Sequence, residues 1–230
     1  MSVSDPLPLR VEDLVIRARD GRSVLELPHL DLPAGGTLAI TGPSGAGKSS
    51  LLHALAGLLR PSKGRILWGT TDIACLSEAA CACFRREKVG LVFQDFLLFE
   101  ELGALGNAAV SATFAPARER PAIETRAQGW LARSGLGQRP EPNVRTFSGG
   151  ERQRVAVARA MSHAPAVILA DEPTASLDRA SADRLIDDLV DVAAAEGRML
   201  IAVTHDARLA ERLGRELKLV DGRVVEQRHG

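Results

Sequence analysis

Short apolar runs alternate along the chain with longer segments of helical periodicity. Runs of five or six apolar or β-branched residues occupy 37–41, 89–93, 166–170 and 199–204. Such runs are typical of parallel strands that are buried on both faces of a sheet. The segments 49–59 and 178–196 are expected to be helices, the first closed by Pro61 and the second by Gly197. This alternation predicts an α/β fold.

Both ends of the chain carry the pattern of antiparallel strands. The segment 9–40 supplies such strands, with a turn at Asp20 and Gly21, and 216–226 forms a hairpin that turns at Asp221 and Gly222. Asp-Gly pairs favour these turns because the tight hairpin needs positive φ angles. We therefore expect an antiparallel β subdomain beside the core.

The middle of the chain has a different pattern. From 95 to 146 the segments are helical and are broken by Pro116, Pro121, Pro140 and Pro142, which predicts a separate helical subdomain. The length of 230 residues suits one core with one such insertion. We expect a single domain over 1–230, with the core and its β subdomain in 1–94 and 155–230 and the helical subdomain in 95–154.

A glycine-rich loop joins the expected strand 37–41 to the helix 49–59. Its sequence, GPSGAGKSS, matches G-x-x-x-x-G-K-[ST], in which backbone N–H groups surround phosphates, Lys48 reaches the β and γ oxygens, and the Ser49 hydroxyl binds Mg²⁺. An ordinary glycine turn explains neither the lysine nor the hydroxyl. The expected phosphate-binding residues are Gly42, Pro43, Ser44, Gly45, Ala46, Gly47, Lys48, Ser49 and Ser50.

A second glycine-rich stretch begins another expected helix. Ser148 and Glu151 have the S-x-x-E spacing of a capping box, and Gly149 and Gly150 allow a ligand to approach the backbone closely. A purely structural helix cap explains the spacing equally well, so at this point both interpretations stay open.

Polar residues follow three of the predicted strands. Asp171 and Glu172 follow 166–170, Gln94 follows 89–93, and His205 follows 199–204. Ligands of open α/β sheets bind at this carboxyl edge. One carboxylate can hold Mg²⁺ while the other polarises a water molecule, and a histidine there can hydrogen-bond a γ-phosphate. An isolated Gln or His at a strand end is usually structural, so Gln94 and His205 indicate a functional site only in combination with the phosphate loop.

In combination, these motifs resemble the ATP-binding cassette (ABC) family over nearly the whole chain. The resemblance implies a P-loop NTPase (RecA-like) core with an antiparallel β subdomain and an inserted α-helical signature subdomain. It implies hydrolysis of ATP to ADP and phosphate with Mg²⁺ as cofactor. The catalytic residues implied are Glu172, His205, Lys48 and Gln94, and the metal ligands are Ser49, Gln94 and Asp171.

The resemblance also implies a composite site. In such proteins two subunits pack head to tail, and the signature of one subunit closes on the nucleotide held by the other. The residues that carry this role here are Ser148, Gly149, Gly150 and Glu151, with Asp178 in the following loop at the same interface. The expected partner is a second copy of the chain or a homologous ABC subunit.

Integral membrane permease subunits are the further partners implied. The motifs are most similar to the lipoprotein-releasing and macrolide-exporter type, which predicts a subunit that drives a membrane permease or mechanotransmission partner. We expect it on the cytoplasmic face of the inner membrane, as a peripheral protein. A non-transport ATPase that regulates a membrane partner, such as a cell-division complex, is the alternative.

Composition limits the other possibilities. Acidic and basic residues balance at 29 each and no dense basic block occurs, so no nucleic-acid partner is expected. No apolar stretch approaches the roughly 18 residues needed to span a bilayer. Cys75, Cys81 and Cys83 lie in an expected helical segment without a nearby histidine, which disfavours a metal site and suits a reducing cytosol.

Two questions stay open. ABC relatives commonly stack the adenine on an early aromatic residue, but no Phe, Tyr or Trp precedes Gly42. Either Arg17 or Arg19 lies over the purine, with weak discrimination between ATP and GTP, or both arginines are solvated. The run 96–99, FLLF, either packs under the helical subdomain or forms a groove for a helix of the membrane partner.

Overall fold

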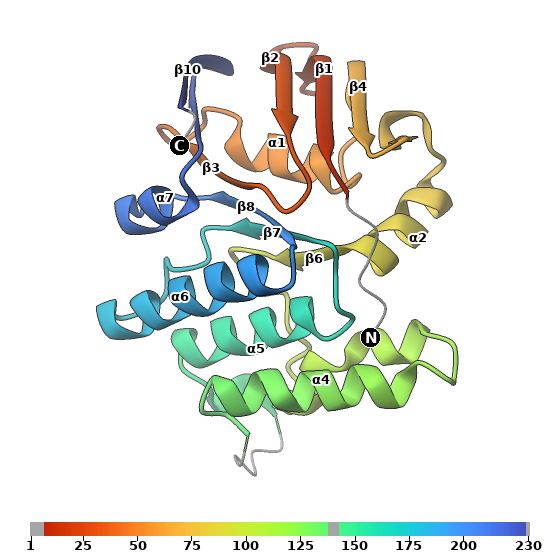
Figure 1. Cartoon of the computed structure of the whole chain (residues 1–230), viewed down its shortest axis with the longest axis vertical. Helices are drawn as coiled ribbons and strands as arrows, with labels where there is room; N and C mark the ends of the chain where they lie inside the picture. The colour runs from red at the N-terminus through yellow and green to blue at the C-terminus, as the bar shows by residue number, and fades with distance from the viewer. Residues whose placement is uncertain (1–6, 138–142, 229–230) are drawn as a thin grey trace.

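The computed structural model describes residues 7–137 and 143–228. Within them, a single sheet of ten strands has the order β5-β4-β1-β2-β10-β9-β3-β8-β7-β6 (Figure 1). The strands are β1 (Leu9–Arg17), β2 (Ser23–Leu32), β3 (Thr37–Thr41), β4 (Lys63–Trp68), β5 (Thr71–Asp72), β6 (Val89–Val92), β7 (Val167–Asp171), β8 (Met199–Val203), β9 (Glu216–Val220) and β10 (Arg223–Arg228). The helices are α1 (Lys48–Leu55), α2 (Glu78–Lys88), α3 (Ala104–Ala108), α4 (Arg120–Arg133), α5 (Gly149–Met161), α6 (Arg179–Ala195) and α7 (Ala207–Leu213), with 3-10 turns η1 (Ile73–Cys75), η2 (Val110–Phe114) and η3 (Val144–Thr146).

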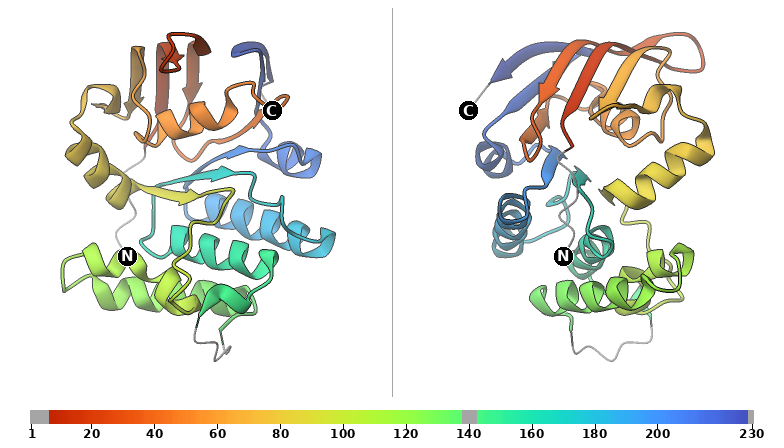
Figure 2. Two further views of the ribbon diagram at one scale, coloured as in Figure 1. Left: turned by 180° about the vertical axis from the view of Figure 1, so that it is seen from behind. Right: turned by 45° about the vertical axis from the view of Figure 1, so that its right-hand side comes forward.

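The parallel strands β9, β3, β8, β7 and β6 are covered on both faces. Val167 and Leu169 of β7 belong to a core shared with α1 and the antiparallel strands β1, β2 and β4. Ile168 and Ala170, which alternate with them, pack against α5, α6 and α7 on the other face. The views in Figure 1 and Figure 2 show the resulting layers, with α1 between the antiparallel and the parallel strands. The predicted α/β fold with an antiparallel β subdomain is confirmed.

The expected elements are found with small shifts at their ends. The strand 37–41 is reproduced as β3, and the other three predicted core strands agree within one residue at each end. Helix α1 ends at Leu55, earlier than the predicted 59, because Gly57 adopts a φ of +64° directly after the C-cap residue Ala56. The predicted hairpin is present, with Asp221 and Gly222 both at positive φ between β9 and β10.

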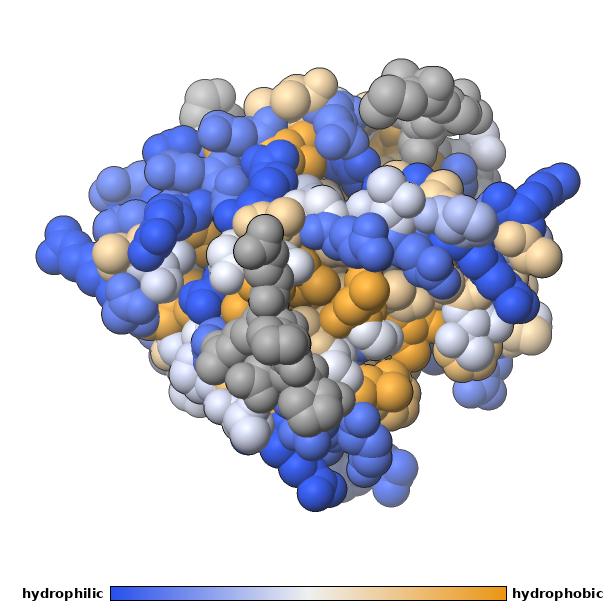
Figure 3. All heavy atoms as spheres, turned by 90° about the horizontal axis from the view of Figure 1, so that it is seen from below, coloured by the Kyte–Doolittle hydropathy of each residue, from blue (hydrophilic) through white to orange (hydrophobic). Residues whose placement is uncertain are grey.

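The middle of the chain is helical, as predicted, and has a small core of its own. Val155 and Ala158 of α5 pack in it with residues of α3 and α4, whereas Val157 and Ala160 of the same helix pack against the parallel sheet. Helix α5 is thus shared between two cores. Viewed from the α4 end, apolar groups gather in the middle of this face between hydrophilic edges (Figure 3). The division at 94 and 154 stays a prediction.

One of the four prolines has a different place from the one expected. Pro121 does not interrupt a helix but lies in the first turn of α4, where its missing N–H has no acceptor to lose. Pro116 precedes the same helix, while Pro140 and Pro142 lie outside the described residues. No helix in the described ranges is both long enough and apolar enough to cross a bilayer.

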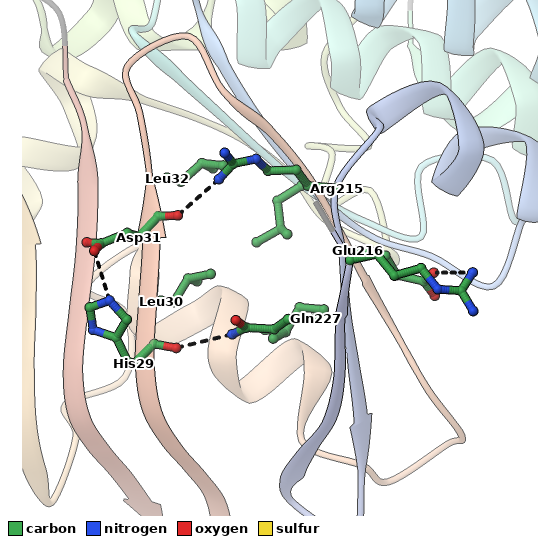
Figure 4. Close-up of a pocket in the computed structure, with 10 residues that line it drawn as sticks. His29, Leu30, Asp31, Leu32, Arg215, Glu216 and Gln227 are labelled. Atoms are coloured by element: carbon green, nitrogen blue, oxygen red, sulfur yellow. Dashed lines mark hydrogen bonds and ion pairs between the residues drawn. The ribbon is translucent and has the colours of Figure 1, made fainter. Parts of the chain in front are cut away.

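One seam in the sheet is held mainly by side chains. Strand β10 pairs with β2 only where Arg223 faces Glu26, and the two strands then diverge around a cavity of about 260 Å³. Across this cavity Arg215 Nη1 donates to the Asp31 carbonyl at 3.2 Å, and Gln227 Nε2 donates to the His29 carbonyl at 3.2 Å (Figure 4). These two side chains bridge the part of the seam that lies beyond the backbone bond from Glu26 N to the Gly222 carbonyl.

Candidate functional site

The glycine-rich loop between β3 and α1 requires glycine at two positions. Gly42 has a φ of +137°, and a Cβ there would lie 2.0 Å from the Leu219 carbonyl oxygen. Gly47, with a φ of +91°, is the residue before α1, and a Cβ on it would lie 2.8 Å from the Val24 carbonyl oxygen. The loop therefore lies against the backbone of β9 and β2 with no room for a side chain.

Positive charge concentrates at the beginning of α1. No side chain caps this helix, so its first N–H groups face the loop and add the positive end of the helix dipole. Lys48 Nζ donates to the carbonyls of Gly42 at 2.8 Å and Pro43 at 2.9 Å, which places the ammonium over the same loop. Together these groups form a site for an anion such as a phosphate chain.

This loop and the ends of three strands enclose a cavity of about 580 Å³. It is lined by Val24, Gly42, Pro43, Ser44, Gly45, Gly47, Lys48, Ser49, Ser50, Gln94, Asp171, Glu172, Ala175, Val203 and His205. The structure thus brings together all the predicted loop residues except Ala46, which is 2% exposed and packs in the main core. Gln94, Asp171, Glu172 and His205 join them, as expected from the shared edge of the sheet.

Asp171 ends β7 and is only 5% exposed. Burial raises the pKa of its carboxyl, while a hydrogen bond from the Ser49 hydroxyl acts in the opposite direction. Its Oδ1 is buried and has no hydrogen-bond partner within the described chain. A buried oxygen of this kind, on a carboxylate bonded to the Ser49 hydroxyl and in the cavity that Gln94 also lines, fits Mg²⁺, which prefers hard oxygen ligands.

Glu172 is held in an unusual backbone conformation next to Asp171. Its φ is +47°, and its N–H donates to the Val203 carbonyl at 2.9 Å. Its Oε2 lies 2.8 Å from His205 Nδ1 and 3.3 Å from the His205 backbone nitrogen. Glu172 is thereby held at the cavity by Val203 of β8 and by His205.

The second glycine-rich stretch lies elsewhere. Ser148 and Glu151 form the predicted capping box of α5, with Glu151 Oε2 accepting from the Ser148 N–H at 2.7 Å and Ser148 Oγ accepting from the Glu151 N–H at 3.3 Å. Neither residue lines the cavity, and the same is true of Gly149, Gly150 and Asp178. These five predicted residues are not brought to the phosphate loop within one chain.

The two parts of this second group contact each other. A Cβ on Gly150 would lie 3.0 Å from Leu177 Cδ2, and one on Gly149 would lie 3.5 Å from Ser176 Cβ. Asp178 is exposed and caps α6, accepting from the Ser181 N–H at 3.1 Å. The beginning of α5 and the loop before α6 thus form one exposed surface.

Sequence reasoning missed Val24 as a cavity residue. It lies at the start of β2, and only the register of β2 against Gly47 reveals its place. Neither Arg17 nor Arg19 lines the cavity, and Arg17 Nη1 donates to the Gly21 carbonyl at 3.0 Å. Each of the two interpretations of the run 96–99 fits part of it. Leu98 packs against the helical core, whereas Leu97 and Phe99 are 56% and 52% exposed and are free to contact a partner.

Comparison with known proteins decides the family. Residues 25–175, with the phosphate loop, Asp171 and Glu172, match the family model described as ABC transporter. The chain belongs to the ABC transporter family. As a member of that family it is an ATP-binding, ATP-hydrolysing subunit with a P-loop NTPase core, as the resemblance of the motifs implied.

Two curated ABC relatives align with most of the chain. The lipoprotein-releasing system ATP-binding protein LolD of Geobacter metallireducens is 41% identical over 202 residues, covering 88% of this chain and 89% of the relative. LolD 2 of Rhodospirillum rubrum is 40% identical over 204 residues, covering 89% and 88%. The narrower resemblance drawn from the motifs agrees with both names.

Solved ABC cassettes have the same fold. The ATP-binding cassette MJ0796, solved as a dimer in a post-hydrolysis state with ADP and Pi, superposes with a TM-score of 0.88 at 30% identity, covering 96% of this chain and 98% of that one. The cassette cbiO1 from Clostridium perfringens, part of the transporter complex cbiONQ, gives a TM-score of 0.83 at 29% identity, covering 98% and 89%.

Proposed function

We propose that this ABC subunit binds MgATP in the cavity at the phosphate loop, dimerises on it, and drives a membrane partner of the lipoprotein-releasing type. The observation that carries the nucleotide chemistry is the buried, unpartnered Asp171 Oδ1 beside the Ser49 hydroxyl, with Lys48 at the same cavity. Ser49, Asp171 and Gln94 would hold Mg²⁺, which when bound neutralises charge on the phosphates.

Hydrolysis follows from the groups around this position. The loop N–H groups and Lys48 bind the phosphate oxygens and stabilise the charge that develops on the γ-phosphate. Glu172 accepts the proton of the attacking water, and His205 orients this carboxylate through the 2.8 Å contact. The exposed imidazole of His205 also lines the cavity and would hydrogen-bond the γ-phosphate.

A second protomer would complete the site. Ser148, Gly149, Gly150, Glu151 and Asp178 form an exposed surface outside the cavity of their own chain, and the positive end of the α5 dipole lies there. We infer that this surface closes on the γ-phosphate bound by a second copy or a homologous ABC subunit. The dimeric MJ0796 structure with ADP and Pi supports this arrangement.

The membrane partner would bind beside Gln94. Leu97 and Phe99 expose apolar side chains within five residues of it, which suits a short apolar helix of an integral membrane permease. The two LolD relatives favour lipoprotein release over the regulatory alternative. The chain would then act at the cytoplasmic face of the inner membrane, as a peripheral protein.

Co-purification from membranes tests the partner. A tagged chain should carry with it an integral membrane protein, and Phe99→Ala should release that protein while ATP binding remains. Val225→Ala is the matched control, because Val225 is 57% exposed but lies on β10. Equal recovery of the membrane protein with Phe99→Ala and Val225→Ala would reject the proposed surface, and recovery of none with the unmodified chain would reject the partner.

A further inference from the structure

The segment after Gln94 has two consecutive residues in a strained conformation. Phe96 and Leu97 have φ angles of +58° and +47°, which non-glycine residues rarely adopt. Local hydrogen bonds, from Phe96 N to the Phe93 carbonyl at 3.2 Å and from Leu97 N to the Asp95 carbonyl at 2.6 Å, form a tight turn here. Strain of this kind persists only where neighbouring structure imposes it.

One side chain holds both strained residues. Arg159 Nη2 donates to the Phe96 carbonyl at 2.7 Å, and Arg159 Nη1 donates to the Leu97 carbonyl at 2.5 Å. The planar guanidinium is suited to this because its N–H groups lie in one fixed fork. Arg159 is half-buried, and burial lowers its pKa. The two carbonyls take the place of water around its guanidinium.

The position of Arg159 links two functional segments. It lies on α5, ten residues after Gly149, which corresponds to about 15 Å of helix. Gln94 lies two residues before Phe96 and lines the nucleotide cavity. Arg159 thus joins the Gln94 loop to one end of the helix that Ser148 caps at its other end.

The other end of the segment is fixed separately. Asn107 is fully buried, and its side chain accepts from the Phe99 N–H at 2.7 Å and donates to the Phe99 carbonyl at 2.9 Å. The exposed Leu97 and Phe99 thus lie on a short segment with two fixed ends, one on α5 through Arg159 and one on α3.

We propose that Arg159 is a positioning residue that fastens the Gln94 loop to α5, so that nucleotide binding at Gln94 moves the Ser148 end of that helix. The proposal rests on the proposed function, since it makes Arg159 the link between the nucleotide cavity and the Ser148 surface that closes on a second protomer. Arg159 itself touches no nucleotide; it acts through the two carbonyls.

A double-mutant cycle on ATP turnover tests this role. Arg159→Gln and Gln94→Ala should each lower turnover about tenfold, and the double variant should stay within about twofold of Gln94→Ala alone, because the fastening has no effect once Gln94 is gone. A reduction in the double variant equal to the product of the two single reductions would overturn the proposal.

Arg126→Gln provides the matched control. Arg126 Nε donates to the Ser162 carbonyl at 2.6 Å, so it also fixes the end of α5 but does not contact the Gln94 loop. It should lower the thermal stability as Arg159→Gln does and leave turnover within about twofold. Equal loss of turnover in both variants would overturn the proposal, since it would mean that any weakening at this end of α5 suffices.

Arg159→Lys covers the case in which Arg159→Gln does not fold. An ammonium keeps the charge but lacks the fork, so turnover should fall and the same non-additivity with Gln94→Ala should appear. Full turnover with Arg159→Lys would overturn the two-carbonyl role. Failure of the proposed function is distinguishable, because then the unmodified protein itself would show no MgATP hydrolysis that depends on Glu172.

Discussion

Glu172 Oε2 is held from two sides by His205, at 2.8 Å from Nδ1 and at 3.3 Å from the backbone nitrogen. Only 12% of the Glu172 side chain is exposed, compared with 73% of His205. The carboxylate is therefore buried and oriented, while its partner remains accessible from the cavity. This relationship suits the two functions proposed for the pair, a fixed base and a group that can respond to the nucleotide.

Replacing Glu172, the proposed base, should separate ATP binding from ATP hydrolysis. Glu172→Gln keeps the shape of the side chain but loses the proton acceptor, so ATP hydrolysis should fall by about 100-fold or more while ATP binding remains. Light scattering with saturating MgATP should then show a long-lived dimer. A Glu172→Gln chain that stays monomeric with MgATP, both alone and beside its membrane partner, would contradict the composite site.

Gly42 and Gly45 of the glycine-rich loop should differ in their tolerance of alanine. Gly42→Ala forces a Cβ to within 2.0 Å of the Leu219 carbonyl oxygen, and should lower the free energy of unfolding by about 3 kcal/mol or more. Gly45→Ala is the control, because Gly45 has a φ of +79° but nothing within 4 Å of the added atom, and should cost only about 1 kcal/mol. Urea denaturation without nucleotide measures both, and equal losses would mean that the contact with β9 is irrelevant.

Discrimination between nucleotide bases should be weak. The cavity offers the side chain of Val24 and neither Arg17 nor Arg19, and an apolar contact gives no hydrogen bonds that distinguish adenine from guanine. The affinity for GTP should lie within about tenfold of that for ATP. Val24→Tyr should strengthen the binding of both nucleotides several-fold, because the ring can stack on either base. A strong preference for ATP in competition binding would eliminate this idea.

His163 should make stability depend on pH. Burial lowers the pKa of this imidazole to about 4, with Arg126 and Arg198 acting in the same direction, although a hydrogen bond to the Val89 carbonyl partly opposes the shift. The folded pKa lies below the unfolded value of about 6.5, so the unfolded chain binds more protons between these values. The neutral His163 imidazole therefore contributes at most about 3 kcal/mol to the free energy of unfolding. This contribution is complete above pH 6.5 and is lost as the pH falls towards 4.

Comparison with His163→Gln isolates this effect from the carboxylates. The difference in unfolding free energy between the two proteins should narrow from pH 7 to pH 4.5 in denaturant titrations. A difference that stays constant over this range would mean that His163 titrates alike in the folded and unfolded chains.

The sequence predicted those parts of the fold that depend on local patterns. The core strands were placed within one residue because a buried parallel strand is a short continuous apolar run, and Asp171 and His205 followed from the ends of these runs. The end of α1 was predicted too late because Gly57 is followed by further helix-forming residues, and only its positive φ stops the helix. Pro121 was misplaced because a proline that starts a helix and one that breaks it look alike in a sequence.

Contacts between distant residues could not be predicted in this way. Arg159 and Phe96 are 63 residues apart, and nothing in either segment indicates the other. Val24 reaches the cavity through the register of β2, which its own side chain does not reveal. The structural meaning of Asn107, a buried amide that bonds the Phe99 backbone, likewise depends on how α3 packs.

The seam between β2 and β10 bears on how the molecule comes apart. Among the described residues, one facing pair, Arg223 and Glu26, joins the two strands, yet the apolar core on one side of the sheet runs beneath both halves. The cooperativity of unfolding must then come from this common core. Native-state hydrogen exchange should find fast-exchanging amides along the seam, while the bulk protein still melts in a single transition.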